Sequence, residues 1–380
     1  MEDSSESNRS NRSHEKESLQ TAAVRLLETA AVTFAGGLLF SLMHVPLSWM
    51  LGPLTATLLW QGLTKRQLAW PVTLRNLGLL LLGYGMGLSF TMESARQIVG
   101  QLPSMLASTV LTVGFSLLMS VWIARAARIT PQSSLLGSIP GGLSQMVVLG
   151  EEFPEADGTI VTFMQTIRLL TVVFIVPFLA VHGLSGGEAA AMPTASVADS
   201  TGSGFAGGGA FMAVVAAFAA LVSGLAAVRL RMPTPWFLGP VIASALMMIA
   251  DWAPPHPPSV LVLAAQWSLG IYLGLGIRFS ALAGWRRLLP YSLAGGLAIV
   301  AFCLVLAYVF SLLHPISMAT AFLSLSPGGM TEMGVTASAV HADVSMVVAY
   351  QMFRILFILF IVPYALRRLF RVPKGTGVEG

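Results

Sequence analysis

The stretch Ile139-Pro140-Gly141-Gly142-Leu143-Ser144-Gln145-Met146 recurs in related form as Ser326-Pro327-Gly328-Gly329-Met330-Thr331-Glu332-Met333. In each copy a Pro-Gly-Gly segment interrupts apolar sequence and is followed by a polar pair. Proline removes a backbone donor, and glycine permits backbone conformations that other residues avoid, so each copy predicts a helix break. A repeated break, followed in each copy by an arginine within apolar sequence, is typical of a transport site rather than a soluble enzyme.

The composition places most of the chain in lipid. It has 380 residues, of which 55% are hydrophobic and 10% are charged, and its mean hydropathy is +0.77. Soluble domains carry roughly a quarter of charged residues. The pI near 9.5 does not indicate nucleic-acid binding, because the basic residues punctuate apolar segments. The single cysteine, Cys303, excludes an intramolecular disulfide and a cysteine-rich metal site.

A helix that spans the hydrocarbon core needs about 20 mostly apolar residues. Ten candidate spans, two of them short, lie near 25–45, 49–63, 72–91, 104–124, 158–181, 208–228, 235–250, 259–279, 290–313 and 344–366. Two further apolar stretches, near 134–150 and 320–340, contain the Pro-Gly-Gly segments. We expect re-entrant hairpins or broken helices there, since irregular backbone is tolerated at membrane depth only where protein or water satisfies its polar groups.

The distribution of positive charge fits this map. With the N-terminus inside and the ten spans alternating, all but three of the 21 Lys and Arg residues lie on the cytoplasmic side. The exceptions are Arg96, which is expected outside, and Arg168 and Arg354, which lie within spans. Because cytoplasmic loops carry an excess of Lys and Arg, we expect a multi-pass protein of the bacterial inner (plasma) membrane with both termini cytoplasmic.

The two halves of the chain correspond throughout. Trp49-Met50-Leu51-Gly52-Pro53 matches Trp236-Phe237-Leu238-Gly239-Pro240 with a shift of 187 residues, and Arg168 matches Arg354 with a shift of 186. The Trp-x-x-Gly-Pro segments are expected to let helices approach closely. With five spans in each half, the second half must enter the membrane inverted relative to the first, which is a common plan of secondary transporters.

The predicted fold is therefore an all-α polytopic membrane protein. It has about ten transmembrane helices in two inverted five-helix repeats, each with a Pro-Gly-Gly re-entrant or broken helix. The predicted organisation is a disordered polar cytoplasmic tail at 1–20, membrane repeat 1 at 21–182, a Gly/Ala/Ser-rich linker at 183–207, membrane repeat 2 at 208–372 and a cytoplasmic tail at 373–380.

The helix that restarts after each Pro-Gly-Gly exposes free N–H groups and the positive end of its dipole, which together make an anion site. The alternative is a membrane kink or packing turn without a ligand. Two copies at equivalent positions favour the binding hypothesis. Its candidate residues in the two hairpins are Pro140, Gly141, Gly142, Ser144, Gln145, Pro327, Gly328, Gly329, Thr331 and Glu332.

An arginine follows each hairpin at membrane depth. Arg168 lies about ten residues into its span, roughly 15 Å deep at the rise of an α-helix, and Arg354 is placed similarly. An unpaired charge there is costly, and such residues are functional candidates by default. The alternative is an arginine that binds hairpin carbonyl groups and supports the hairpin, and the two roles are compatible. Candidates on the same helix faces are Gln165 and Gln351, with Asp157 and Asp343 as secondary ones.

The two copies differ in one charge. Gln145 of the first hairpin corresponds to Glu332 of the second. A membrane-depth carboxylate could bind H⁺ or Na⁺, and burial would raise its pKa unless a cation compensates. The alternative is a salt bridge between Glu332 and Arg354.

The chain resembles the duplicated AbrB-like membrane protein family of bacteria over nearly its whole length after about residue 20. The resemblance rests on the two Pro-Gly-Gly hairpins, the two Trp-x-x-Gly-Pro segments and the two Gln-x-x-Arg spans. It implies the labels that members often carry, which are transcriptional regulator and ammonia monooxygenase.

These observations favour an ion-coupled secondary transporter of a small anionic, carboxylate-like solute that works by alternating access between inverted repeats. The alternatives are a membrane sensor or scaffold that affects gene expression indirectly and, less favoured, a membrane monooxygenase. No catalytic residue, metal site or cofactor is predicted, because the six histidines share no metal-ligand spacing and no nucleophile or nucleotide motif occurs. The expected partners are the lipid bilayer, the solute and H⁺ or Na⁺, with no nucleic acid, and a homo-oligomer stays open.

Overall fold

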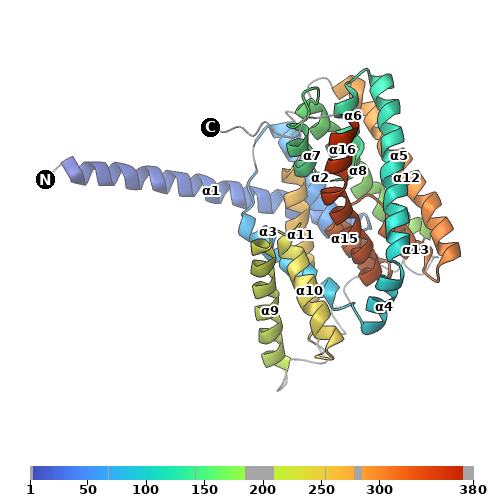
Figure 1. The fold of residues 1–380 in the computed structure, drawn as a ribbon. Coiled ribbons are helices and arrows are strands. Elements are labelled where there is room, and N and C mark those ends of the chain that lie inside the picture. Colours follow the sequence, from blue (N-terminus) through green and yellow to red (C-terminus); the bar gives the residue numbers. More distant parts are fainter. Residues whose placement is uncertain are drawn as a thin grey trace. The chain divides into compact units, whose positions relative to one another are not determined.

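The computed structural model describes residues 3–66, 68–141, 143–184, 209–252, 254–277 and 285–370 (Figure 1). Within these ranges it is helical without a strand, which confirms the all-α prediction. The predicted 183–207 linker lies almost wholly outside the described residues, and the 373–380 tail does so completely.

The elements are α1 (Asp3–Leu42), α2 (Ser48–Thr64), α3 (Val72–Gly87), α4 (Met92–Gly100), α5 (Leu102–Ala127), α6 (Pro131–Ser138), α7 (Leu143–Gly150), α8 (Gly158–Leu179), η1 (Ala180–Leu184), α9 (Gly209–Arg229), α10 (Pro235–Ile249), α11 (Ser259–Leu275), α12 (Trp285–Leu313), α13 (Met318–Leu325), α14 (Met330–Ala339), α15 (Val344–Phe360) and α16 (Val362–Leu369).

Six described segments are long and apolar enough to cross a membrane. They are Ala23–Leu42, Leu102–Ala127, Gly158–Leu184, Phe211–Arg229, Arg287–Leu313 and Val344–Arg368, and each coincides with a predicted span. The other four predicted spans form α2, α3, α10 and α11, which have 17, 16, 15 and 17 residues. At 1.5 Å per residue these helices are about 25 Å long or less, short of the roughly 30 Å hydrocarbon core.

The short helices have identifiable ends. Leu47 precedes α2 and Thr234 precedes α10, both with left-handed backbone, and Lys65 ends α2 in the same conformation. A left-handed residue cannot continue a right-handed helix. Of the ten predicted spans, two of which were expected to be short, six have spanning length among the described residues and four are shorter.

The N-terminal segment differs from its prediction. Residues 1–20 were expected to be disordered, whereas α1 begins at Asp3 and continues without a break into the first apolar span. Extending an existing helix costs far less than nucleating a new one, so the apolar span can propagate helix into the polar segment before it.

The chain forms two compact units. The first comprises residues 1–82 and 257–278 and contains α1, α2, α11 and most of α3. Its helices meet at glycines. A Cβ on Gly52 would collide with the backbone of Gly36, and one on Gly270 would collide with the backbone of Met50. The predicted packing role of the Trp-x-x-Gly-Pro segment is confirmed here.

The second unit comprises residues 83–256 and 279–380 and contains contacts equivalent to those of the first. A Cβ on Gly239 would collide with the backbone of Ser223, and one on Gly83 would collide with the backbone of Phe237. Every residue in these two pairs lies 187 positions from its counterpart in the first unit. In both units a helix of one half of the sequence thus packs against a helix of the other half.

Within the second unit, α5 and α12 lie side by side and run antiparallel (Figure 1). Ser104 Oγ, near the start of α5, lies 3.0 Å from Nε2 of His314, which directly follows α12. At the middle, the rings of Phe115 and Phe302 stack with centroids 4.2 Å apart. These two phenylalanines are also separated by 187 residues. Equivalent residues of the two halves therefore meet at the centre of the pair.

The two Pro-Gly-Gly segments break helices, as predicted. Each lies between two short helices of the second unit, α6 and α7 in the first copy and α13 and α14 in the second. Ile139 and Ser326 have extended backbone, with ψ of 130° and 137°. A following proline disfavours helical backbone, so α6 and α13 each end one residue before the extended residue that precedes Pro140 or Pro327. The N–H groups of Gly141 and Gly328 then turn back to the carbonyls of Ile139 and Ser326, at 2.8 and 2.9 Å.

Candidate functional site

Each helix break leaves a carbonyl without its normal donor, and a glutamine replaces that donor. In an α-helix the carbonyl of Leu136 would accept from residue 140, but Pro140 has no N–H group. Gln165 Nε2, from α8, donates to this carbonyl at 2.7 Å. In the second copy, Gln351 Nε2 donates to Leu323 O at 2.8 Å, four residues before Pro327. Both amides also reach the last carbonyl before the proline.

The arginines bind the same helix ends. Arg168 Nη1 donates to Ile139 O at 2.7 Å, and Arg354 Nη1 donates to Ser326 O at 2.6 Å. A cation at the C-terminus of a helix is favoured because the last carbonyls lack partners and the dipole is negative there. Contact between the arginine and the hairpin carbonyls, the alternative left open by the sequence, is therefore present in both copies.

The two arginines differ in how far the protein satisfies them. Arg354 is 4% exposed, and its Nη2 also donates to Gly328 O at 2.8 Å and to Gln351 Oε1. Arg168 is partly exposed and, among the described residues, bonds through Nη1 alone, with Ser138 O at 3.4 Å as its second acceptor. Neither arginine has a carboxylate within ion-pair distance among the described residues. In the second copy Nη2 thus bonds the hairpin and Gln351, a contact that the first copy lacks among the described residues, whereas Nε has no hydrogen-bond partner in either arginine.

Asp157 and Asp343 lie at helix starts, away from the arginines. Asp157 caps α8 by accepting from Thr159 N at 2.8 Å, and Asp343 caps α15 by accepting from Met346 N at 3.0 Å. The backbone N–H of each donates to a hydroxyl on the preceding hairpin, Ser133 in the first copy and Thr320 in the second. Capping satisfies otherwise free N–H groups, so these secondary candidates position the arginine-bearing helices.

Glu332 does not pair with Arg354 in the structure, so the predicted alternative of a salt bridge between them is wrong here. The Glu332 side chain is 5% exposed, and its Oε2 is buried without a hydrogen-bond partner. It folds back over the start of its own helix, where a Cβ on Gly329 would collide with Oε2. Burial raises the pKa of the Glu332 carboxyl, which lies in α14, outside the six candidate spans.

The remaining hairpin candidates have local roles or are not described. A Cβ on Gly141 would meet the side chain of Met146, and one on Gly328 would meet that of Met333, so each glycine leaves room for a methionine of the following helix. Thr331 is buried in α14 and Gln145 is partly exposed in α7. Gly142 and the side chain of Ser144 lie outside the described residues.

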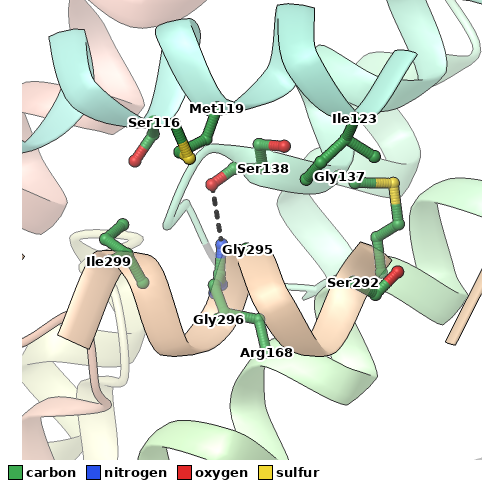
Figure 2. Close-up of a pocket in the computed structure, with 11 residues that line it drawn as sticks. Ser116, Met119, Ile123, Gly137, Ser138, Arg168, Ser292, Gly295, Gly296 and Ile299 are labelled. Carbon is green, nitrogen blue, oxygen red and sulfur yellow. Dashed lines mark hydrogen bonds between the residues drawn. The ribbon is translucent and has the colours of Figure 1, made fainter. Parts of the chain in front are cut away.

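A cavity that sequence analysis missed adjoins Arg168 (Figure 2). Its volume of about 20 Å³ leaves room for one or two water-sized groups. Figure 2 shows Ser116 and Met119 of α5 on one side and Gly295 and Gly296 of α12 on the other. The signal in the sequence was the departure from the repeat, since α5 carries Ser108 and Thr109 where α12 carries the two glycines.

Three polar atoms in the cavity wall are buried without a partner. They are Oγ of Ser138, Oγ of Ser292 and Nε of Arg168. Ser292 is 4% exposed. Buried polar groups are nearly always hydrogen-bonded in proteins. Three such groups around one cavity therefore indicate a place for a polar ligand or water. Within the described residues, no three His, Cys, Asp or Glu side chains group together as a metal site would require.

Comparison with known proteins finds a family model and two relatives that each match most of this chain. A family model described as transition state regulatory protein AbrB matches residues 49–370. One relative, named "Uncharacterized protein YhjN" from Bacillus subtilis (strain 168), is 27% identical over 353 residues, covering 88% of this chain and 90% of the relative. Another, named "Putative regulator AbrB" from Escherichia coli (strain K12), is 26% identical over 329 residues, covering 84% of this chain and 89% of the relative.

Proposed function

This chain belongs to the AbrB family, and we propose that within it the protein is an ion-coupled secondary transporter of a small anionic, carboxylate-like solute. The proposal places it in the bacterial inner membrane with both termini in the cytoplasm, since that orientation puts most Lys and Arg residues inside. It assigns no catalytic residue and no cofactor.

The observation that carries the proposal is the pair of arginines at two equivalent helix breaks. Arg168 and Arg354 each lie within a segment long and apolar enough to cross a membrane, and neither has a carboxylate partner among the described residues. A cation in that setting is expensive unless something compensates its charge. Hairpin carbonyls compensate part of it at both arginines, and an anion bound beside the less satisfied Arg168 would compensate more. Broken helices that end near the bilayer midplane are the usual binding elements of secondary transporters.

The arrangement of the two halves supports inverted repeats. Phe115 and Phe302, which are equivalent by sequence, stack where α5 and α12 cross antiparallel. A two-fold axis that relates two antiparallel helices through equivalent residues is perpendicular to both. If the helices span a membrane, such an axis lies in its plane, as for inverted repeats. Alternating access would then follow when the two hairpins exchange environments.

Glu332 is the best candidate for coupling to H⁺. Its carboxyl is buried, has an unpartnered oxygen and has its pKa raised by burial. A carboxyl held neutral by burial binds a proton, and exposure to water would release it. Gln145 stands at the equivalent position of the first hairpin and cannot titrate.

Flux through the purified protein tests the proposal. Proteoliposomes should take up at least one small carboxylate faster than protein-free liposomes, and Arg168→Ala and Arg354→Ala should each abolish the excess. Gln266→Leu, on α11, is a matched control, since its side chain has no hydrogen bond in the part of the chain that the structure describes. Unchanged uptake in both arginine variants would overturn the site assignment.

A regulatory membrane sensor is the second candidate, and the names of the family and of one relative favour it. The two candidates differ in what Arg168→Ala should do to gene expression. If regulation follows solute movement, a flux-deficient variant loses any effect on expression. If the protein acts through a bound cytoplasmic partner, the same variant keeps both the partner and the effect.

A further inference from the structure

We infer that the cavity beside Arg168 binds the carboxylate group of a small monocarboxylate, whereas Arg354, its equivalent in the second half, is a structural cap. The inference rests on the proposed function for the role of this anion as the transported solute. Binding at the cavity is measurable independently of transport.

The first step is the difference in charge satisfaction between the arginines. Arg354 donates to Ser326 O and Gly328 O, and these carbonyls come from both sides of Pro327. The equivalent Nη2 bond to Gly141 does not occur for Arg168, which holds only the carbonyls before Pro140. The guanidinium of Arg168 therefore keeps donors available, and it adjoins a cavity.

The second step is the chemistry of the cavity wall. Ser138 Oγ, Ser292 Oγ and Arg168 Nε all lack partners, and each can donate a hydrogen bond. A carboxylate accepts hydrogen bonds through two oxygens, and a bond to arginine is charge-assisted. No carboxylate side chain lines the cavity within the part of the chain that the structure describes. The site thus offers donors and positive charge to a ligand that supplies only acceptors.

The third step is why only the first half has this space. Ser292, Gly295 and Gly296 of α12 correspond to Met105, Ser108 and Thr109 of α5. Met105 is 1% exposed, and the Ser108 hydroxyl donates to a carbonyl of its own helix. The equivalent positions of α5 thus carry larger side chains, whereas glycines and a serine without a hydrogen-bond partner line the cavity beside Arg168.

The size of the cavity limits the ligand. A volume of about 20 Å³ admits roughly one carboxylate oxygen without movement. Met119 and Met164 also line it, and their flexible thioethers can yield to admit a small group. Monocarboxylates such as formate and acetate are therefore suitable probes, whereas a dicarboxylate would need further opening.

Ligand-induced stabilisation of the full-length, detergent-solubilised protein tests the inference. Sodium formate and sodium acetate should raise the unfolding temperature above that in sodium chloride of equal ionic strength. The reason is that a ligand that binds the folded protein and not the unfolded chain stabilises the folded protein. Arg168→Gln should weaken binding by about 10- to 150-fold, as expected for a charge-assisted hydrogen bond. Arg354→Lys should lower the unfolding temperature without ligand and leave the formate-induced shift intact.

Ser292→Ala separates binding from structure. If Ser292 only fills space, removing its unpaired hydroxyl changes nothing or stabilises the protein, and the formate affinity stays unchanged. If it donates to the ligand, formate affinity falls about 2- to 10-fold while the ligand-free stability does not fall. Ser311→Ala is the matched control on α12, since the Ser311 hydroxyl bonds its own helix at Tyr308 O.

Three outcomes would overturn the inference. They are no rise in unfolding temperature with either carboxylate, an equal rise with chloride, or a rise with carboxylate that persists in Arg168→Gln. Uptake by proteoliposomes is measured in parallel. Carboxylate binding without uptake would leave the inference standing and refute the transport proposal. Uptake that depends on Arg354 and not on Arg168 would support the transport proposal and refute the inference.

Discussion

Replacement of Gln351 by leucine tests how the broken helix is held. The amide of Gln351 is fully buried and donates to Leu323 O at 2.8 Å. Pro327 removes the N–H group that would otherwise reach this carbonyl, so Gln351→Leu leaves a buried acceptor without a partner. The cost of such a group is about 1–3 kcal/mol. Ser326 O keeps its bond from Arg354 and adds little to the loss.

The assay is unfolding of the purified protein by SDS in mixed micelles, followed by tryptophan fluorescence. A loss of 1–3 kcal/mol corresponds to roughly a 5- to 150-fold change in the unfolding equilibrium. Gln266→Leu, which removes an amide without a hydrogen bond in the part of the chain described, should change it much less.

A double-mutant cycle identifies the cause. Pro327→Ala restores an N–H group four residues after Leu323, so Gln351→Leu should cost less in that background. The reasoning is refuted if Gln351→Leu costs no more than Gln266→Leu, or if its cost is the same with and without Pro327.

Three further predictions concern Glu332, the glycine contacts and the antiparallel helices. Because burial raises the pKa of Glu332, the contribution of this carboxyl to stability is complete below the usual pKa of a glutamate and is lost as pH rises towards the raised value. Glu332→Gln should therefore flatten this part of the pH profile of the free energy of unfolding. An unchanged profile would count against the raised pKa. Gly239→Ala should lower the free energy of unfolding by about 1–3 kcal/mol, because the new Cβ meets the backbone of Ser223. Gly114→Ala is the control, since its Cβ meets nothing within 4 Å, and it should be neutral or stabilising in the same thermal unfolding measurement. In a Cys303→Ser background, Ser104→Cys combined with His314→Cys should form a disulfide on mild oxidation. Ser104→Cys combined with Tyr291→Cys should not, because Tyr291 lies near the opposite end of α12. A disulfide in the second pair instead of the first would exclude the antiparallel contact of α5 and α12.

The sequence predicted those parts of the fold that depend on local chemistry. Pro140 and Pro327 end helices wherever they are placed, and the glycines of the Trp-x-x-Gly-Pro segments mark close helix contacts. Six of the predicted apolar spans became helices of spanning length. The short α2 and α10 also agree with their predicted ranges, whereas α3 and α11 each end four residues before the predicted end of the span.

The contacts of the candidate residues at the helix breaks could not be predicted from the sequence. Sequence spacing placed Gln165 and Arg168 on one face of α8, but only the fold shows that both face the carbonyl end of α6. The separation of Glu332 from Arg354 also depends on tertiary structure, since the carboxyl folds back towards Gly329. The cavity needed both halves at once, because its wall combines Ser138 of α6 with Ser292 of α12.

The most direct test of the account is charge movement across proteoliposomes on a solid-supported membrane. After a rapid jump to formate, acetate or lactate, the account predicts a transient current for at least one carboxylate, absent from protein-free liposomes and lost in Arg168→Gln. Folding of each variant is verified by its unfolding temperature. The account is contradicted if folded wild-type protein gives neither current nor uptake with any small carboxylate, or if Arg168→Gln retains the wild-type current.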